Sequence, residues 1–174
     1  MKTKTDVKIS LKTFLLPNAD KLIEEYVANG NRLSPRAQLK ALELPNAPEI
    51  FYDLAKHGWD IRATALLKIL EFPNADKIIA EYIKYDFNLP YDVLKKIFKQ
   101  PYAEKIIKDY VAQGWDLTIR TELQILELPN AAKIFAELIK CGHTLSKTIQ
   151  LKLLKQMAAQ SPLRKKSGKT YVLD

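Results

Sequence analysis

Five prolines recur at a fixed spacing of 28 residues, and this spacing constrains the fold more than any other feature. Four of them lie in copies of one motif, an apolar residue followed by Pro-Asn-Ala, and the other lies in the altered form Gln-Pro-Tyr-Ala. A fixed period of this size is typical of proteins in which consecutive copies of one unit stack. The five are Pro17, Pro45, Pro73, Pro101 and Pro129.

Each copy carries the pattern of a pair of short helices. After Pro45, apolar residues stand at the positions i, i+3, i+4, i+7 and i+8, which share one face of an α-helix. We expect the side chain of Asn46 to cap this helix, because its oxygen can accept a hydrogen bond from a free amide of the first turn. Glycine enters the left-handed conformation that ends many helices without penalty. Such glycines follow four of the copies: Gly30, Gly58, Gly114 and Gly142.

A second helix precedes each proline motif. Ser34 and Pro35 predict its start, since serine is a good N-cap and proline is favoured at the first helical position. Its predicted exposed face consists of Arg36, Lys40 and Glu43. Its predicted buried face consists of Ala37, Leu39, Ala41, Leu42 and Leu44.

Helices this short do not persist alone in water, so each must bury its apolar face on the neighbouring copy. The sequence therefore predicts an all-α fold, an αα-solenoid of about five 28-residue helix-pair repeats with an N-terminal half-repeat. We expect one solenoid domain over residues 1–160 and a basic, flexible tail over residues 161–174.

The net charge of +8 is concentrated at the two ends of the chain. Residues 1–13 and residues 161–174 contribute +3 each, which leaves +2 for the rest. A protein that follows a phosphate backbone is expected to carry its basic excess along its body. The distribution of charge therefore favours a protein partner over nucleic acid.

The sequence offers no membrane span and no secretory signal. No apolar run approaches ~18 residues, and the first residues lead into no apolar signal region. Cys141 is the single cysteine, so the chain forms no internal disulfide. We expect a cytoplasmic monomer, and delivery of such a protein into a host cell stays open.

The repeated unit resembles an ankyrin repeat. The runs Thr64 to Glu71 and Asn74 to Ile79, and the connector Gly114 to Leu117, carry the resemblance. Ankyrin units likewise place a helix, a short turn, a second helix and then a Gly-x-Asp turn with an apolar residue. This unit has 28 residues rather than about 33, and the shortage falls where ankyrin repeats extend a β-hairpin finger. The Thr-Pro-Leu-His signature is also missing, with Thr64 to Leu67 as the nearest approach.

The resemblance implies a scaffold that binds another protein, usually through its concave surface. It implies no catalytic residue, because ankyrin repeats supply none. The missing finger removes one of the surfaces that ankyrin repeats use, so the resemblance gives less guidance on where a partner docks.

Cys141 and His143 lie close together near a predicted turn and could form a nucleophile and base, or two metal ligands. The same positions in an earlier copy hold His57 and Trp59, and no third ligand or orienting carboxylate follows at a recognisable spacing. We therefore interpret Cys141 and His143 as turn residues. The sequence predicts no catalytic residue, no metal site and no cofactor.

Two sets of positions are candidate partner-binding surfaces. One is the exposed stripe of the helix after Ser34 and of its copies, formed by Arg36, Lys40, Thr64, Lys68, Asp92, Lys96, Arg120 and Gln124. The other is an aromatic row at one connector position, formed by Trp59, Phe87 and Trp115. An exposed row would offer interface anchors or stacking platforms, whereas a buried row would be core between repeats.

These patterns favour a non-catalytic scaffold that binds another protein through the surface of its stacked helix pairs. The alternative is a nucleic-acid-binding helical repeat protein. It would use the basic ends of the chain and a lysine column that includes Lys40, Lys68 and Lys96.

Overall fold

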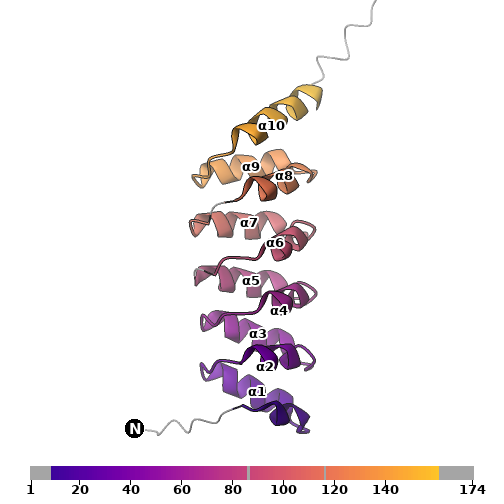
Figure 1. The fold of residues 1–174 in the computed structure, drawn as a ribbon, viewed down its shortest axis with the longest axis vertical. Coiled ribbons are helices and arrows are strands. Elements are labelled where there is room, and N and C mark those ends of the chain that lie inside the picture. The colour runs from indigo at the N-terminus through magenta and orange to yellow at the C-terminus, as the bar shows by residue number, and fades with distance from the viewer. Residues whose placement is uncertain (1–8, 86, 116, 161–174) are drawn as a thin grey trace, which may run out of the picture. The chain divides into compact units, whose positions relative to one another are not determined.

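The structure, a computed structural model, describes residues 9–85, 87–115 and 117–160 (Figure 1). Within these residues it contains ten α-helices, one 3-10 helix and no strand, which confirms the predicted all-α class. The chain forms two compact units, with the boundary between residues 115 and 116. The predicted tail lies outside the described residues, and the single domain over residues 1–160 stays a prediction. Of the helices described, none is long and apolar enough to cross a bilayer.

The first unit contains a row of longer helices, each beginning at the alanine of the proline motif or its altered copy. Each helix of this row packs on the next one (Figure 1). Their starting residues follow the 28-residue period of the prolines. The row consists of α1 (Ala19–Ala28), α3 (Ala47–Lys56), α5 (Ala75–Lys84) and α7 (Ala103–Ala112).

A row of shorter helices packs alongside in the same unit, and we call it the short-helix row. It consists of the 3-10 helix η1 (Leu11–Leu15), α2 (Pro35–Ala41), α4 (Ala63–Ile69) and α6 (Tyr91–Ile97). Each of these also contacts the next. The second unit contains α8 (Ile119–Leu126), α9 (Ala131–Lys140) and α10 (Lys147–Gln160), and α8 contacts both of the others.

The helical periodicity predicts the core of the longer helices correctly. Ile50, Phe51 and Leu54 are fully buried on α3, and Ile78 and Ile79 are fully buried on α5. Such side chains stabilise the fold by about 1.5–3 kcal/mol each through removal of apolar surface from water.

The prediction that Leu39 is buried is wrong, because 46% of its surface is exposed. Gln38 takes the buried position on α2 instead. Its amide nitrogen donates to the carbonyl of Asp60 at 2.8 Å, and its oxygen accepts from the amide of Arg62 at 3.0 Å. Both polar groups of Gln38 are therefore satisfied, which makes its burial tolerable and turns Leu39 toward solvent.

The prediction of asparagine caps is also wrong. Asn46 has φ −100° and ψ 25°, outside the extended region that directs a capping oxygen at the first turn, and its side chain makes no cap hydrogen bond. Its amide group instead donates to the carbonyl of Asp20 at 3.1 Å and to Glu24 Oε2 at 2.6 Å, both on α1. Asn74 likewise donates to the carbonyl of Pro48. The asparagine ties one copy to the one before it.

The turns at the ends of the helices follow the sequence prediction. The hydroxyl of Ser34 accepts from the amide of Ala37 at 3.3 Å and caps α2. The four glycines after the longer helices all have positive φ, as the left-handed C′ position requires.

Buried tyrosines form a second set of hydrogen bonds between copies. The hydroxyl of Tyr82 on α5 donates to Asp60 Oδ1 at 3.2 Å, and that of Tyr110 on α7 donates to Asn88 Oδ1. Burial raises the pKa of both hydroxyls above their usual value, because it disfavours the charged phenolate. The connectors between helices are thus fixed by the next copy of the unit.

Candidate interaction surface

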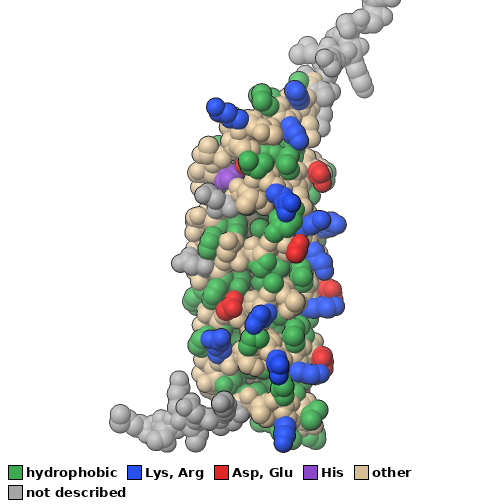
Figure 2. Space-filling view, in the orientation of Figure 1, with side chains coloured by type: hydrophobic (Ala, Val, Ile, Leu, Met, Phe, Trp, Pro, Cys, Tyr) green, Lys and Arg blue, Asp and Glu red, His purple; other side chains and the backbone are tan. Residues whose placement is uncertain are grey.

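Six residues of the predicted stripe lie exposed on one row of helices in the first unit. They occupy equivalent positions on α2, α4 and α6, which contact one another in order, so the row presents them together. In Figure 2, basic side chains recur along the helices of this unit, with acidic side chains beside several of them. The six are Arg36, Lys40, Thr64, Lys68, Asp92 and Lys96.

The other two stripe residues belong to the second unit. Arg120 is exposed on α8, and Gln124 is half-buried on the same helix. The structure therefore brings six of the eight predicted residues together within one unit.

The charge of the short-helix row changes along its length. Lys40 pairs with Glu43 at 3.0 Å and Lys68 pairs with Glu71 at 3.8 Å, so both lysines have an acidic neighbour one turn away. After α6 the equivalent of that acid is a lysine, Lys99. A further lysine, Lys95, replaces the leucine found at position 39 and its other copies. Lys95, Lys96 and Lys99 are all exposed and form a local cluster of like charge.

The aromatic row is neither fully exposed nor fully buried, which were the two alternatives from the sequence. Trp59, Phe87 and Trp115 are all half-buried. Phe87 stacks on Tyr82 with ring centroids 4.8 Å apart, and Trp115 stacks on Tyr110 at 6.0 Å. These two rings thus pack against the longer helix of their own copy and leave only part of their surface to a partner.

An apolar groove lies at the beginning of the first unit, between η1 and α2, with a volume of about 480 Å³. Arg36, Lys40 and Glu43 form its polar part. Its apolar lining consists of Leu11, Phe14, Leu15, Leu39 and Leu44. Three of those leucines are strongly exposed, at 47% for Leu11, 84% for Leu15 and 46% for Leu39. Figure 2 shows hydrophobic side chains on the surface at this end of the unit.

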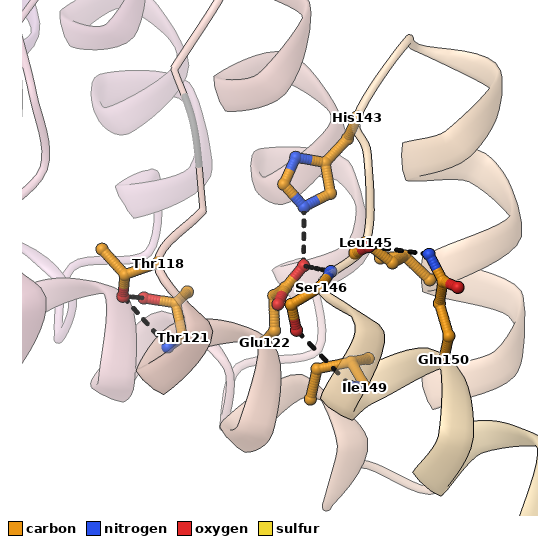
Figure 3. A network of polar contacts seen from close by, with 8 residues as sticks. All are labelled: Thr118, Thr121, Glu122, His143, Leu145, Ser146, Ile149 and Gln150. Atoms are coloured by element: carbon orange, nitrogen blue, oxygen red, sulfur yellow. Dashed lines mark hydrogen bonds and ion pairs between the residues drawn. The ribbon is translucent and has the colours of Figure 1, made fainter.

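A buried polar network in the second unit connects α8 to the segment between α9 and α10 (Figure 3). Glu122 on α8 and His143, in the connector after α9, are 1% and 8% exposed. Nε2 of His143 lies 3.0 Å from Oε1 of Glu122, and the amide of Ser146 donates to the same oxygen at 3.3 Å. The amide of Ser146 can only donate, so Oε1 accepts this hydrogen bond, and it accepts from Nε2 of His143 in the tautomer that carries the proton on Nε2.

This network repeats an arrangement of the first unit in a charged form. Gln38 is the equivalent of Glu122, and Arg62, whose amide donates to Gln38, is the equivalent of Ser146. The second oxygen of Glu122 is buried and has no hydrogen-bond partner among the described residues. A buried carboxylate with one unsatisfied oxygen depends strongly on its remaining partners. The arrangement explains His143 as a structural partner of Glu122.

Cys141 is exposed at the end of α9, whereas His143 points into the network. Over the described residues, no group of three or more His, Cys, Asp or Glu side chains is placed to hold a metal ion. The two residues that the sequence placed together as a possible reactive pair therefore have different surroundings.

Sequence reasoning missed the groove because it assigned Leu39 to the core. A signal for exposure was present at the equivalent position of α6, which holds Lys95. A position that accepts lysine in one copy is accessible to water in that copy, and the shared backbone makes the other copies similar.

Comparison of the chain with known protein families, with curated proteins and with solved structures finds no match.

Proposed function

We propose that this chain is a non-catalytic αα-solenoid of about five helix-pair repeats that binds another protein through its short-helix row. The observation that carries the proposal is the exposure of large apolar side chains beside charged ones on that row. Leu11 and Leu39 are each almost half exposed, next to Arg36 and Lys40. Interfaces between proteins combine an apolar centre with a polar rim, and an exposed apolar patch marks such a surface.

The regular spacing of the helices supports the repeat architecture. The longer helices of the first unit begin 28 residues apart, and so does α9 of the second unit relative to α7. The left-handed glycine that follows four of them is the turn of the ankyrin-like pattern. We propose an ankyrin-like unit without the β-hairpin finger, in which the row of short helices takes over the role of binding surface.

Nucleic acid is the second candidate, and the cluster of Lys95, Lys96 and Lys99 favours it. The exposed ion pairs of Lys40 with Glu43 and of Lys68 with Glu71 oppose a phosphate only weakly. Exposed leucines, however, offer nothing to a phosphate backbone. The protein partner therefore accounts for more of the row.

Reversing three charges on the row tests the proposal. We expect K40E/K68E/K96E to lower recovery of the partner from native cells by at least about tenfold, because each substitution replaces an attractive rim charge with a repulsive one. The measurement is affinity purification with quantitative mass spectrometry, performed with the variant and the wild type in parallel.

The matched control places the same charge change on the longer helices, as K21E/K56E/K77E on α1, α3 and α5, where all three lysines are exposed. Equal recovery with both triple variants would contradict the proposal. Binding of nucleic acid at low salt, with an affinity that falls roughly a thousandfold at moderate salt, would instead support the second candidate.

A further inference from the structure

The groove between η1 and α2 continues into a row of basic side chains. On the short helices and the two residues after α2, α4 and α6, exposed basic residues outnumber acidic ones. The acidic residues are Glu43, Glu71 and Asp92. The basic residues are Lys12, Arg36, Lys40, Lys68, Lys95, Lys96 and Lys99. An apolar pocket at one end and a lysine cluster at the other thus mark the two ends of one surface.

The segments of this chain that could fill the groove carry the wrong charge. Residues 1–8 contain three lysines and one aspartate, and residues 161–174 contain four basic residues and one aspartate. A second molecule of the protein could offer the exposed leucines of its helix α10 to the groove. These leucines lie among Lys147, Lys152 and Lys155. Each of these would bring positive charge to a rim that already holds Arg36 and Lys40, and like charges in contact oppose binding.

We propose that the groove and the lysine cluster together bind an acidic segment of a partner protein. A large apolar side chain of that segment occupies the space among Leu11, Leu15 and Leu39, and its carboxylates follow the row to Lys95, Lys96 and Lys99. Neighbouring helices pack about 8–10 Å apart, so α2 and α6 are separated by roughly 20 Å. About six residues of extended chain cover that distance. This inference rests on the proposed protein-binding function and specifies the chemistry of the partner.

The existing ion pairs are compatible with such a ligand. Lys40 and Glu43 pair at 3.0 Å, with side chains 53% and 66% exposed, and pairs this exposed contribute little to stability. An incoming carboxylate can therefore bind Lys40 at small cost. Arg36 lines the same groove and offers a planar donor suited to a carboxylate.

Selection from a random displayed-peptide library against the full-length protein provides the test. We expect the selected peptides to carry net negative charge and at least one large apolar residue. In fluorescence anisotropy, L11S/L39S and K95E/K96E/K99E should each weaken binding of a selected peptide by about tenfold or more. All of these side chains are exposed, so the variants should retain their helical circular dichroism.

The matched control is I139S, since Ile139 on α9 is 54% exposed and lies outside the groove. It should leave peptide affinity unchanged. A selected pool without negative charge, or a pool that binds L11S/L39S as tightly as wild type, would overturn the inference and leave the protein-binding function standing on another surface. Failure to select any peptide would also overturn the inference. The proposed protein-binding function would then still be tested by crosslinking to a partner protein in cells.

Three further outcomes would assign the groove to a different occupant and so overturn the inference. Self-association of the wild type in sedimentation, lost in L11S/L39S, would identify a second copy. Peptide affinity that rises about tenfold when residues 1–8 are deleted would identify the chain's own segment. Displacement of the peptide by single-stranded DNA, with DNA binding sensitive to the lysine variant and insensitive to L11S/L39S, would identify nucleic acid.

Discussion

Replacing His143 with alanine is expected to lower the free energy of unfolding by about 3–5 kcal/mol. The reason is the buried carboxyl group of Glu122, which is hydrogen-bonded to Nε2 of His143 at 3.0 Å and has a second oxygen with no partner among the described residues. Removal of the imidazole leaves a buried charge held only by the amide of Ser146. Urea unfolding followed by circular dichroism measures the loss.

Two variants test whether the loss comes from the unpaired charge. The double variant E122L/H143W introduces the residues found 28 positions earlier, Leu94 and Trp115. It should regain most of the lost stability, because replacing a buried pair by apolar residues of suitable size is often neutral. H57A changes an exposed histidine and should cost less than about 1 kcal/mol. If H143A proves as mild as H57A, Glu122 does not depend on His143.

Replacing Gly58 with alanine is expected to destabilise the protein by about 1.5–3.5 kcal/mol. Gly58 has φ +67°, and a left-handed backbone costs an alanine roughly 1–2 kcal/mol. Its added Cβ would also lie 2.7 Å from Cδ1 of Tyr85. The ring cannot move away freely, because its hydroxyl donates to the carbonyl of Lys56 at 2.6 Å. Loss of that hydrogen bond adds about 0.5–1.5 kcal/mol.

Gly114 provides the matched control for the steric part. It occupies the same turn 56 residues later, with φ +86°, and an added Cβ meets no atom of the described residues within 4 Å. G114A should therefore cost only the backbone penalty of about 1–2 kcal/mol. Equal midpoints of thermal unfolding for the two variants would show that contact with Tyr85 does not contribute.

The sequence predicted the elements that depend on local signals. The helix starts, the cap at Ser34 and the left-handed glycines follow from residue types and their spacing within one copy, and the structure confirms them. The fully buried side chains of α3 and α5 follow from the same helical periodicity.

The features that the sequence did not predict depend on contacts between copies. Asn46 looks like a cap by its position, yet its amide group finds acceptors on α1, 22 and 26 residues earlier. Glu122 was assigned no role, because nothing within its own helix indicates a histidine 21 residues later. Leu39 is apolar but exposed, because Gln38 takes the buried position beside it. The side-chain nitrogen and oxygen of Gln38 are both hydrogen-bonded, to the backbone of Asp60 and of Arg62. Such partners become visible only when the copies are placed side by side.

Photocrosslinking at Thr64 tests most directly whether a partner protein binds the short-helix row. Thr64 is exposed at the middle of the stripe on α4 and carries no charge, so a photoreactive amino acid there removes no ion pair. Lys77, exposed on the longer helix α5, is the control position. The proposed function predicts that Thr64, and not Lys77, crosslinks to another protein in living cells. Crosslinks from Lys77 alone, crosslinks from Thr64 to nucleic acid, or no crosslink from Thr64 would contradict it.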